Sequence, residues 1–201
     1  MSSYLAFRYI EREGMDFYEG LHHENIPLPN PEHFTYVHTA QDIDNAIQKV
    51  FDSLQGEKLG ICLSGGMDSA ILASYMRGCD AYTFRFLGGE YQKEELARAE
   101  YYAKYYGLNL HYVDINWNTV QNCLSPVIRS KNAPVRSIEP QLYHAALQAK
   151  ADGVTRLIVG ESSDLIFGGM DQLLSKDWTV EDFAKRYTFL DPTLVLKQPE
   201  D

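Results

Sequence analysis

Residues 59–72 read LGICLSGGMDSAIL, and this stretch decides the fold. It opens with a short apolar run, passes through the adjacent glycines Gly65 and Gly66, and continues as an apolar helix from Ala70. Glycines at such a turn let the backbone adopt positive φ angles and come close to a bulky anion. Free N–H groups at the start of a helix attract the same anion. The order of strand, glycine turn and helix therefore predicts a loop that binds phosphate.

The rest of the chain alternates between short apolar runs and helical segments. Four runs are too brief for a helix: Leu59 to Leu63, Ala81 to Phe86, Leu110 to Ile115 and Arg156 to Val159. Helical character falls between them at Ser69 to Met76, Gln92 to Tyr106, Val120 to Ile128 and Pro140 to Lys150. Apolar strands that alternate with helices are typical of a parallel sheet covered on both faces. We therefore expect an α/β fold with a doubly wound, mainly parallel sheet that binds its ligand at the carboxyl ends of the strands.

The segments before and after this α/β region predict the domain boundaries. A helix is predicted to start at Thr39, which can cap it, with Asp42 in its first turn, and to end near Gly56. Before it, Tyr4 to Ile10 has the composition of a strand, but three prolines between residues 27 and 31 disfavour regular structure. We expect an irregular N-terminal extension at residues 1–38, an α/β domain at residues 39–170, and a short helical C-terminal part of that domain at residues 171–201.

The turn itself limits the chemistry. Ser64 to Ser69 reads SGGMDS, which has neither the lysine of a Walker A loop nor the glycine spacing of a dinucleotide fingerprint. Transfer of a γ-phosphoryl group or of a hydride is therefore disfavoured. Asp68 would repel phosphate unless a cation came with it, so we expect Asp68 to bind a Mg²⁺ that bridges to a polyphosphate. The alternative is an ordinary glycine turn in which Asp68 only favours the helix dipole.

The SGGMDS segment resembles the Ser-Gly-Gly-x-Asp-Ser signature of the N-type ATP pyrophosphatases, or PP-loop enzymes. A second segment, GESSDLIFGGM at residues 160–170, is similar to Gly-Glu-Gly-x-Asp-Glu-x-Phe-Gly-Gly-Tyr in the asparagine synthetase branch of that superfamily. Ser162, Leu165 and Met170 depart from the pattern, where a glycine, an acid and an aromatic residue are usual. The similarity covers residues 39–170 and implies an adenine nucleotide alpha hydrolase-like fold.

The resemblance also implies roles for individual residues. The loop would hold the pyrophosphate of ATP during attack on the α-phosphorus, which yields an adenylate. The residues expected to bind the nucleotide are Leu63, Ser64, Gly65, Gly66, Asp68, Ser69, Phe86, Val159 and Gly160, with the backbone of Phe86 reading the adenine edge. Asp164, at the end of a neighbouring strand, can face the Mg²⁺ of Asp68 from the other side. Glu161 would take the proton that an attacking nitrogen must lose. Asp68, Asp164 and Glu161 are thus the expected catalytic residues.

These features predict an ATP-dependent ligase that adenylates a small carboxylate and passes it to ammonia or an amine. Asparagine synthetase has an N-terminal cysteine in a glutaminase domain, whereas Ser2 follows Met1 here. Ammonia would then come from solution or from a separate glutaminase subunit, or an amine would replace it. Two alternatives remain open: a PP-loop enzyme that adenylates a nucleotide or tRNA base, and an ATP-binding module without catalysis.

Composition and charge limit the partners and the cellular compartment that we expect. The formal net charge of −10 gives no electrostatic reason to expect nucleic acid or an anionic membrane as a partner. No apolar run approaches the roughly 18 residues of a membrane helix, and three widely spaced cysteines do not form a disulfide framework. We expect a cytoplasmic protein, and a homo-oligomer stays open.

Two sets of basic residues are weaker candidates. Arg85, Arg129 and Arg136 could bind a substrate carboxylate, with surface ion pairs as the alternative. The resemblance implies a lysine in the C-terminal part that stabilises charge during adenylation. Lys176, Lys185 and Lys197 are candidates for it by elimination alone.

Overall fold

The computed structural model describes residues 2–7, 10, 14–15, 19, 30–88, 92–132, 135–161, 163 and 175–197. The chain forms two compact units. The larger unit is Pro27–Ser163, and the smaller one combines Met1–Ile26 with Asp164–Asp201.

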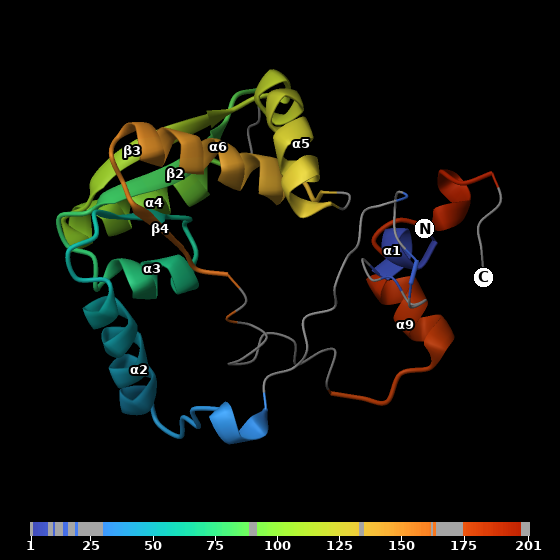
Figure 1. Cartoon of the computed structure of the whole chain (residues 1–201), viewed down its shortest axis with the longest axis horizontal. Helices are drawn as coiled ribbons and strands as arrows, with labels where there is room; N and C mark the ends of the chain where they lie inside the picture. The colour runs from blue at the N-terminus through green and yellow to red at the C-terminus, as the bar shows by residue number, and fades with distance from the viewer. Residues whose placement is uncertain are drawn as a thin grey trace. The chain divides into compact units, whose positions relative to one another are not determined.

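A four-stranded parallel sheet forms the centre of the larger unit (Figure 1). Its strands are β1 (Leu59–Cys62), β2 (Asp80–Phe86), β3 (Asn109–Ile115) and β4 (Arg156–Val159). They are arranged in the order β3-β2-β1-β4, so the chain builds outward from β1 on one side and then returns to the other. Such a reversal leaves a crevice at the carboxyl ends of the two strands where it occurs, here β1 and β4.

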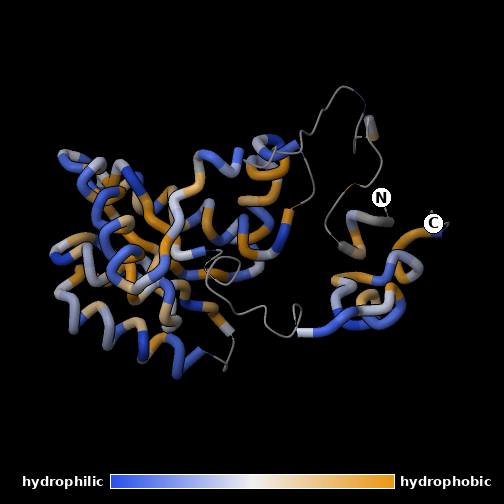
Figure 2. Tube along the Cα trace, turned by 90° about the horizontal axis from the view of Figure 1, so that it is seen from below, coloured by the Kyte–Doolittle hydropathy of each residue, from blue (hydrophilic) through white to orange (hydrophobic). Residues whose placement is uncertain are grey.

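Helices cover both faces of this sheet. The helices of the unit are α2 (Ala40–Ser53), α3 (Met67–Ala73), α4 (Lys93–Tyr106), α5 (Trp117–Lys131) and α6 (Ile138–Ala151). α3 and α4 contact each other and the strands, whereas α6 contacts β2, β3 and α5. In Figure 2 the helices alternate between hydrophobic and hydrophilic residues, as expected for helices with one face on a sheet. The predicted α/β, doubly wound fold is therefore confirmed.

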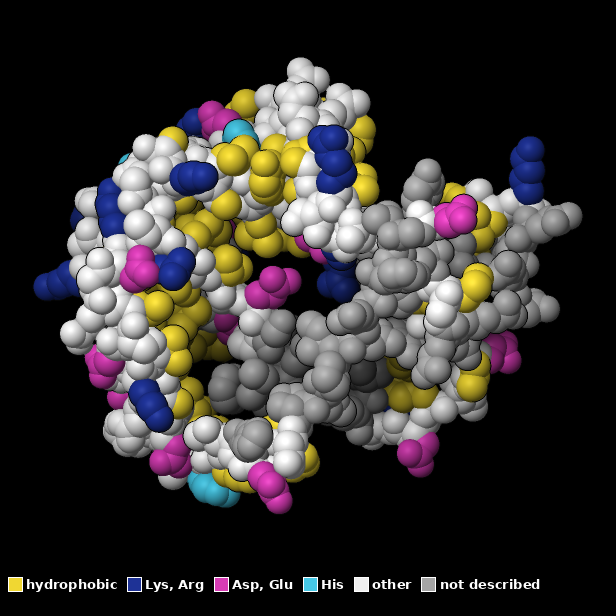
Figure 3. Space-filling model, viewed as in Figure 1, with side chains coloured by type: hydrophobic (Ala, Val, Ile, Leu, Met, Phe, Trp, Pro, Cys, Tyr) yellow, Lys and Arg dark blue, Asp and Glu magenta, His cyan; other side chains and the backbone are white. Residues whose placement is uncertain are grey.

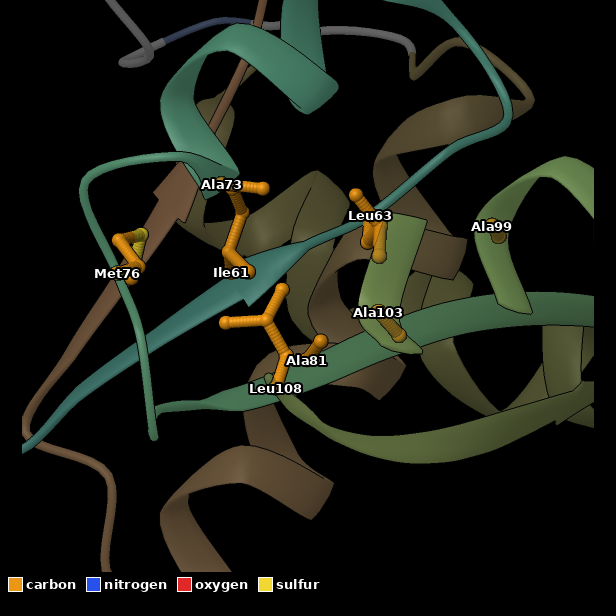
Figure 4. Packing of buried hydrophobic residues seen from close by; sticks show 8 residues of the cluster. All are labelled: Ile61, Leu63, Ala73, Met76, Ala81, Ala99, Ala103 and Leu108. Atoms are coloured by element: carbon orange, nitrogen blue, oxygen red, sulfur yellow. The ribbon is translucent and has the colours of Figure 1, made fainter. Parts of the chain in front are cut away.

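Two separate cores follow from the alternation of side chains along the strands. Ile61 and Leu63 point into one cluster, while Cys62 between them points into the other. Figure 4 shows the first cluster: Ile61, Leu63, Ala73, Met76, Ala81, Ala99, Ala103 and Leu108. The second contains Cys62, Tyr82, Val113, Ile115, Ala145, Ala149 and Val154. Small alanines on the inner faces of α4 and α6 let the helix backbones pack close to the strands.

The start of α2 is stabilised as its sequence predicts. The hydroxyl of Thr39 accepts a hydrogen bond from the N–H of Asp42 (3.2 Å), and the Asp42 carboxylate accepts one from the N–H of Thr39 (2.9 Å). This reciprocal pair is a capping box. α5 begins earlier than expected, because Asn116 caps it by accepting from the N–H of Thr119 (2.9 Å).

The smaller unit contains α1 (Ser2–Phe7), α9 (Val180–Tyr187) and the 3-10 helix η2 (Pro192–Leu194). Although Tyr4 to Ile10 has the composition of a strand, this stretch is helical as far as Phe7. Contacts of α1 with α9 and η2 explain the difference, together with a hydrogen bond from the N–H of Phe189 to the carbonyl of Ala6 (2.9 Å). Such tertiary contacts override local propensity. A second 3-10 helix, η1 (Pro31–His33), belongs to the larger unit.

Within the described part of the chain, no helix combines the length and hydrophobicity needed to cross a membrane.

Candidate active site

A cavity of about 300 Å³ lies at the carboxyl ends of β1, β2 and β4. Hydrophobic side chains gather where this unit is hollowed (Figure 3). Seven residues predicted from the sequence line the cavity: Leu63, Ser64, Ser69, Phe86, Val159, Gly160 and Glu161. The structure thus brings most of the predicted nucleotide-binding residues to one edge of the sheet. Their binding roles remain predictions.

Two serine hydroxyls hold the loop between β1 and α3 from inside. Ser69 is 3% exposed, and its Oγ accepts a hydrogen bond from the N–H of Ser64 (3.1 Å). The same Oγ lies 2.9 Å from Ser64 Oγ and 3.2 Å from the carbonyl oxygens of Ser64 and Gly66. Ser64 Oγ in turn accepts from the N–H of Gly66 (3.1 Å). The loop is therefore already ordered by its own side chains.

Gly65 of this loop is needed for a different reason from the one expected. Neither Gly65 nor Gly66 has a positive φ, so the expectation of a left-handed turn is wrong. A Cβ on Gly65 would instead lie 2.6 Å from the carbonyl oxygen of Glu95 in α4. Glycine at position 65 is required because the backbone of a neighbouring helix approaches it closely.

The end of β4 lies directly against the loop. In the β1–β4 ladder Cys62 is opposite Val159, so Leu63 and Gly160 follow side by side. A Cβ on Gly160 would lie 3.1 Å from the backbone nitrogen of Ser69 and 3.3 Å from the carbonyl carbon of Asp68. The two sequence motifs therefore meet at adjacent strand ends.

Asp68, in the first turn of α3, is half-buried and makes no hydrogen bond or ion pair within the described residues. A carboxylate oxygen without a protein partner suits Mg²⁺, which binds through one or two carboxylates together with phosphate oxygens. Asp164, the second expected ligand, lies outside the described residues. Among those that are described, no group of three acidic, histidine or cysteine side chains could hold a metal ion.

The described lining of the cavity carries two acids and no base. Glu161 is exposed and follows Gly160 at the end of β4, and Glu95 comes from the first turns of α4. No lysine, arginine or histidine is among the described lining residues. Burial raises the pKa of the Cys62 thiol to about 12, so this side chain is a neutral wall of the cavity at physiological pH.

Two polar residues at this site were missed from the sequence. Gln92 accepts a hydrogen bond at Oε1 from the N–H of Phe86 (2.7 Å), so the backbone group expected to read adenine already has a partner. Arg98 donates from Nε to the carbonyl of Gly65 (3.0 Å). Gln92 is the N-cap residue of α4 and Arg98 lies in its second turn, and no local sequence signal marks either contact.

Three of the weaker basic candidates have partners of their own. Arg85 forms two hydrogen bonds with Asp114 (2.6 and 2.9 Å), which favours the ion-pair alternative for this residue. Lys185 pairs with Glu181 (2.8 Å) within α9, and Lys176 lies 4.0 Å from the centre of the Trp178 ring.

A family model for asparagine synthase matches residues 40–198. The chain belongs to the asparagine synthase family. The resemblance to the asparagine synthetase branch is thereby confirmed. A comparison with curated proteins gives no match.

Several solved structures are similar to this member of the asparagine synthase family. A predicted subunit of tRNA methyltransferase from Methanocaldococcus jannaschii is 19% identical over 63% of this chain and 60% of its own, with a TM-score of 0.36. NMN synthetase from Francisella tularensis is 21% identical over 59% and 50%, with a TM-score of 0.38. NAD+ synthetase from Burkholderia pseudomallei is 14% identical over 82% and 87%, with a TM-score of 0.41. The chain thus spans 60% and 50% of the first two proteins.

Proposed function

We propose that this protein is an ATP-dependent ligase that adenylates a carboxylate substrate, releases pyrophosphate, and transfers the acyl group to ammonia or an amine. One observation supports this most strongly: the glycine loop after β1 and the Gly160–Glu161 end of β4 lie against each other at the reversal point of a parallel sheet. Such a crevice is where open α/β sheets bind nucleotides.

The loop residues suit a pyrophosphate leaving group. Ser64 and Ser69 supply hydroxyls at the cavity, and the lack of a lysine fits cleavage at the α-phosphorus better than γ-transfer. Asp68 and Asp164 would hold Mg²⁺, which when bound offsets the negative charge of the polyphosphate. The cavity beyond the loop would take the base and the acyl group.

In this proposal Glu161 acts on the nitrogen. A carboxylate at the rim of the cavity can accept the proton that the attacking nitrogen loses as the amide bond forms. The nitrogen could come from ammonia in solution, from ammonia delivered by a separate glutaminase subunit, or from a substrate amine.

Free thiols at Cys62, Cys79 and Cys123 support a reducing compartment such as the cytoplasm.

Exchange of labelled pyrophosphate into ATP, measured with a panel of carboxylates, tests the first half-reaction. We expect exchange that depends on one class of carboxylate, with AMP as the nucleotide product. Asp68→Ala is expected to abolish it, while Asp177→Ala, which removes an exposed acid in the smaller unit, serves as the matched control. Formation of ADP, or unchanged exchange in Asp68→Ala, would contradict the proposal.

The second half-reaction is tested with Glu161→Gln. This variant is expected to retain pyrophosphate exchange and to lose most of its amide formation, since only the later step needs the base. Equal loss of both steps would remove Glu161 from the role of base. AMP formed only when tRNA is added would instead favour a base-modifying PP-loop enzyme.

A further inference from the structure

α4 packs against the glycine loop at Gly65. Arg98 donates from Nε to the carbonyl oxygen of Gly65 (3.0 Å). Glu95, one turn earlier, fills the space that a side chain at position 65 would need. The only ion pair of Arg98 within the described residues is a 3.9 Å contact with Glu94, and exposed pairs of this kind contribute little. The contact with Gly65 is therefore the specific one.

This contact fixes the direction of a peptide group. The Gly65–Gly66 peptide is trans, so its C=O and its N–H point to opposite sides. The C=O points toward Arg98, while the N–H points toward Ser64 Oγ (3.1 Å), a residue that lines the cavity. A glycine peptide rotates at low steric cost. If it turned over, a carbonyl oxygen would replace the N–H beside Ser64 Oγ, whose residue lines the cavity.

We propose that Arg98 is a positioning residue for pyrophosphate: it anchors the Gly65 carbonyl so that the Gly66 N–H stays beside Ser64 Oγ, at the cavity that would receive the anion. The proposal rests on the function given above, in which this loop binds pyrophosphate. A carbonyl facing the ligand would repel it, so the orientation decides whether the loop attracts or rejects an anion. Arg98 also places a positive charge against a loop whose described cavity lining holds none.

Three variants of the full chain separate this role from a purely structural one. Arg98→Met keeps the aliphatic stem beside Gly65 and removes the donor, Arg98→Lys restores a charged donor, and Glu94→Gln removes only the weak ion pair. Binding of inorganic pyrophosphate in the presence of Mg²⁺ is measured by calorimetry, which needs no turnover. Thermal unfolding is followed alongside.

We expect Arg98→Met to weaken pyrophosphate binding about tenfold, the effect of losing one hydrogen bond from a charged donor. Arg98→Lys should recover part of the affinity, and Glu94→Gln should bind as the wild type does. In an NMR titration, the Gly66 amide resonance should shift with pyrophosphate in the wild type and in Glu94→Gln, and much less in Arg98→Met. A purely structural tether would not produce this signature.

Equal binding by Arg98→Met and the wild type would overturn the proposal and leave the ligase function untouched. Weaker binding that follows a lower unfolding midpoint, with no recovery in Arg98→Lys, would also overturn it. Wild-type protein that binds pyrophosphate without any carboxylate-dependent exchange would refute the ligase reaction alone. A wild-type protein that binds no pyrophosphate would refute both.

Discussion

Replacing Gly65 by alanine tests the close approach of α4 to the loop. The added Cβ would lie 2.6 Å from the carbonyl oxygen of Glu95, 3.0 Å from its Cα and 3.1 Å from Arg98 Cβ. Ordinary van der Waals contact begins at 3.4 Å, so the loop and the helix must separate by ~0.8 Å. Two of the three contacts are with backbone atoms, and no change of rotamer can relieve them.

Overpacking of this kind costs about 1–3 kcal/mol. Because backbone must move on both sides, we expect the upper half of that range for Gly65→Ala, about 2–3 kcal/mol. For a chain of this size, that corresponds to an unfolding midpoint lower by roughly 4–12 °C. The displacement also lengthens the Arg98–Gly65 hydrogen bond, so pyrophosphate binding should weaken in the same variant.

Urea denaturation gives the free energy of unfolding, with Gly66→Ser as the matched control. Gly66 has φ −90° and ψ 161°, which serine adopts readily, and a Cβ there meets only Ser64 Oγ, a side-chain atom, at 3.2 Å. Serine also suits the N-cap of α3, so its stability should stay within about 0.5 kcal/mol of the wild type. If Gly65→Ala proved as stable as Gly66→Ser, the inferred packing of α4 against the loop would be refuted.

Three further changes have defined outcomes. Ser69→Ala removes a buried hydroxyl that accepts from the N–H of Ser64 and should lower the free energy of unfolding by about 0.5–1.5 kcal/mol in urea titrations; a neutral effect would argue against the hydroxyl network. A hydrogen bond from His111 keeps the pKa of Asp80 below its usual value, so this carboxylate stabilises the fold above about pH 4 and ceases to do so as pH falls through the lowered pKa. Asp80→Asn should therefore be less stable than the wild type near pH 7, by a margin that shrinks in acid, and a margin independent of pH would contradict this. Gln92→Leu frees the N–H of Phe86 and should lower the KM for ATP about two- to fivefold, whereas a higher KM would show that Gln92 itself contacts the nucleotide.

The fold could be predicted from the sequence because strands buried on both faces leave few alternatives. β4 has the predicted bounds, and β1, β2 and β3 each differ by one residue at one end. Parallel strands also place their carboxyl ends at one edge, so the meeting of the loop with Gly160 followed once the strands were recognised. The adjacency of the motifs was thus fixed by topology rather than by any local signal.

The contacts around the loop could not be predicted, since they depend on which turn of α4 abuts it. Hydrophobic periodicity indicates the face that a helix turns to the sheet, and not how far the helix slides along it. Arg98 and Gln92 therefore looked like ordinary polar residues of an exposed helix. Gly65 was recognised as necessary, but for a turn conformation that it does not adopt.

The glycine loop lies between the backbones of α4 and β4, and this position determines which residues of the proposed site can be substituted. α4 approaches the loop at Gly65 and β4 approaches it at Gly160, so side chains at either glycine would displace it. The sequence departures from the asparagine synthetase pattern, Ser162, Leu165 and Met170, all follow Gly160 in the chain, and none replaces a residue in these close approaches. Backbone contacts that exclude a Cβ tolerate no substitution, whereas side chains that face a substrate can change with it. We therefore expect adenylation to be retained and the acyl substrate to differ from aspartate, so that aspartate should support less pyrophosphate exchange than another carboxylate in the panel.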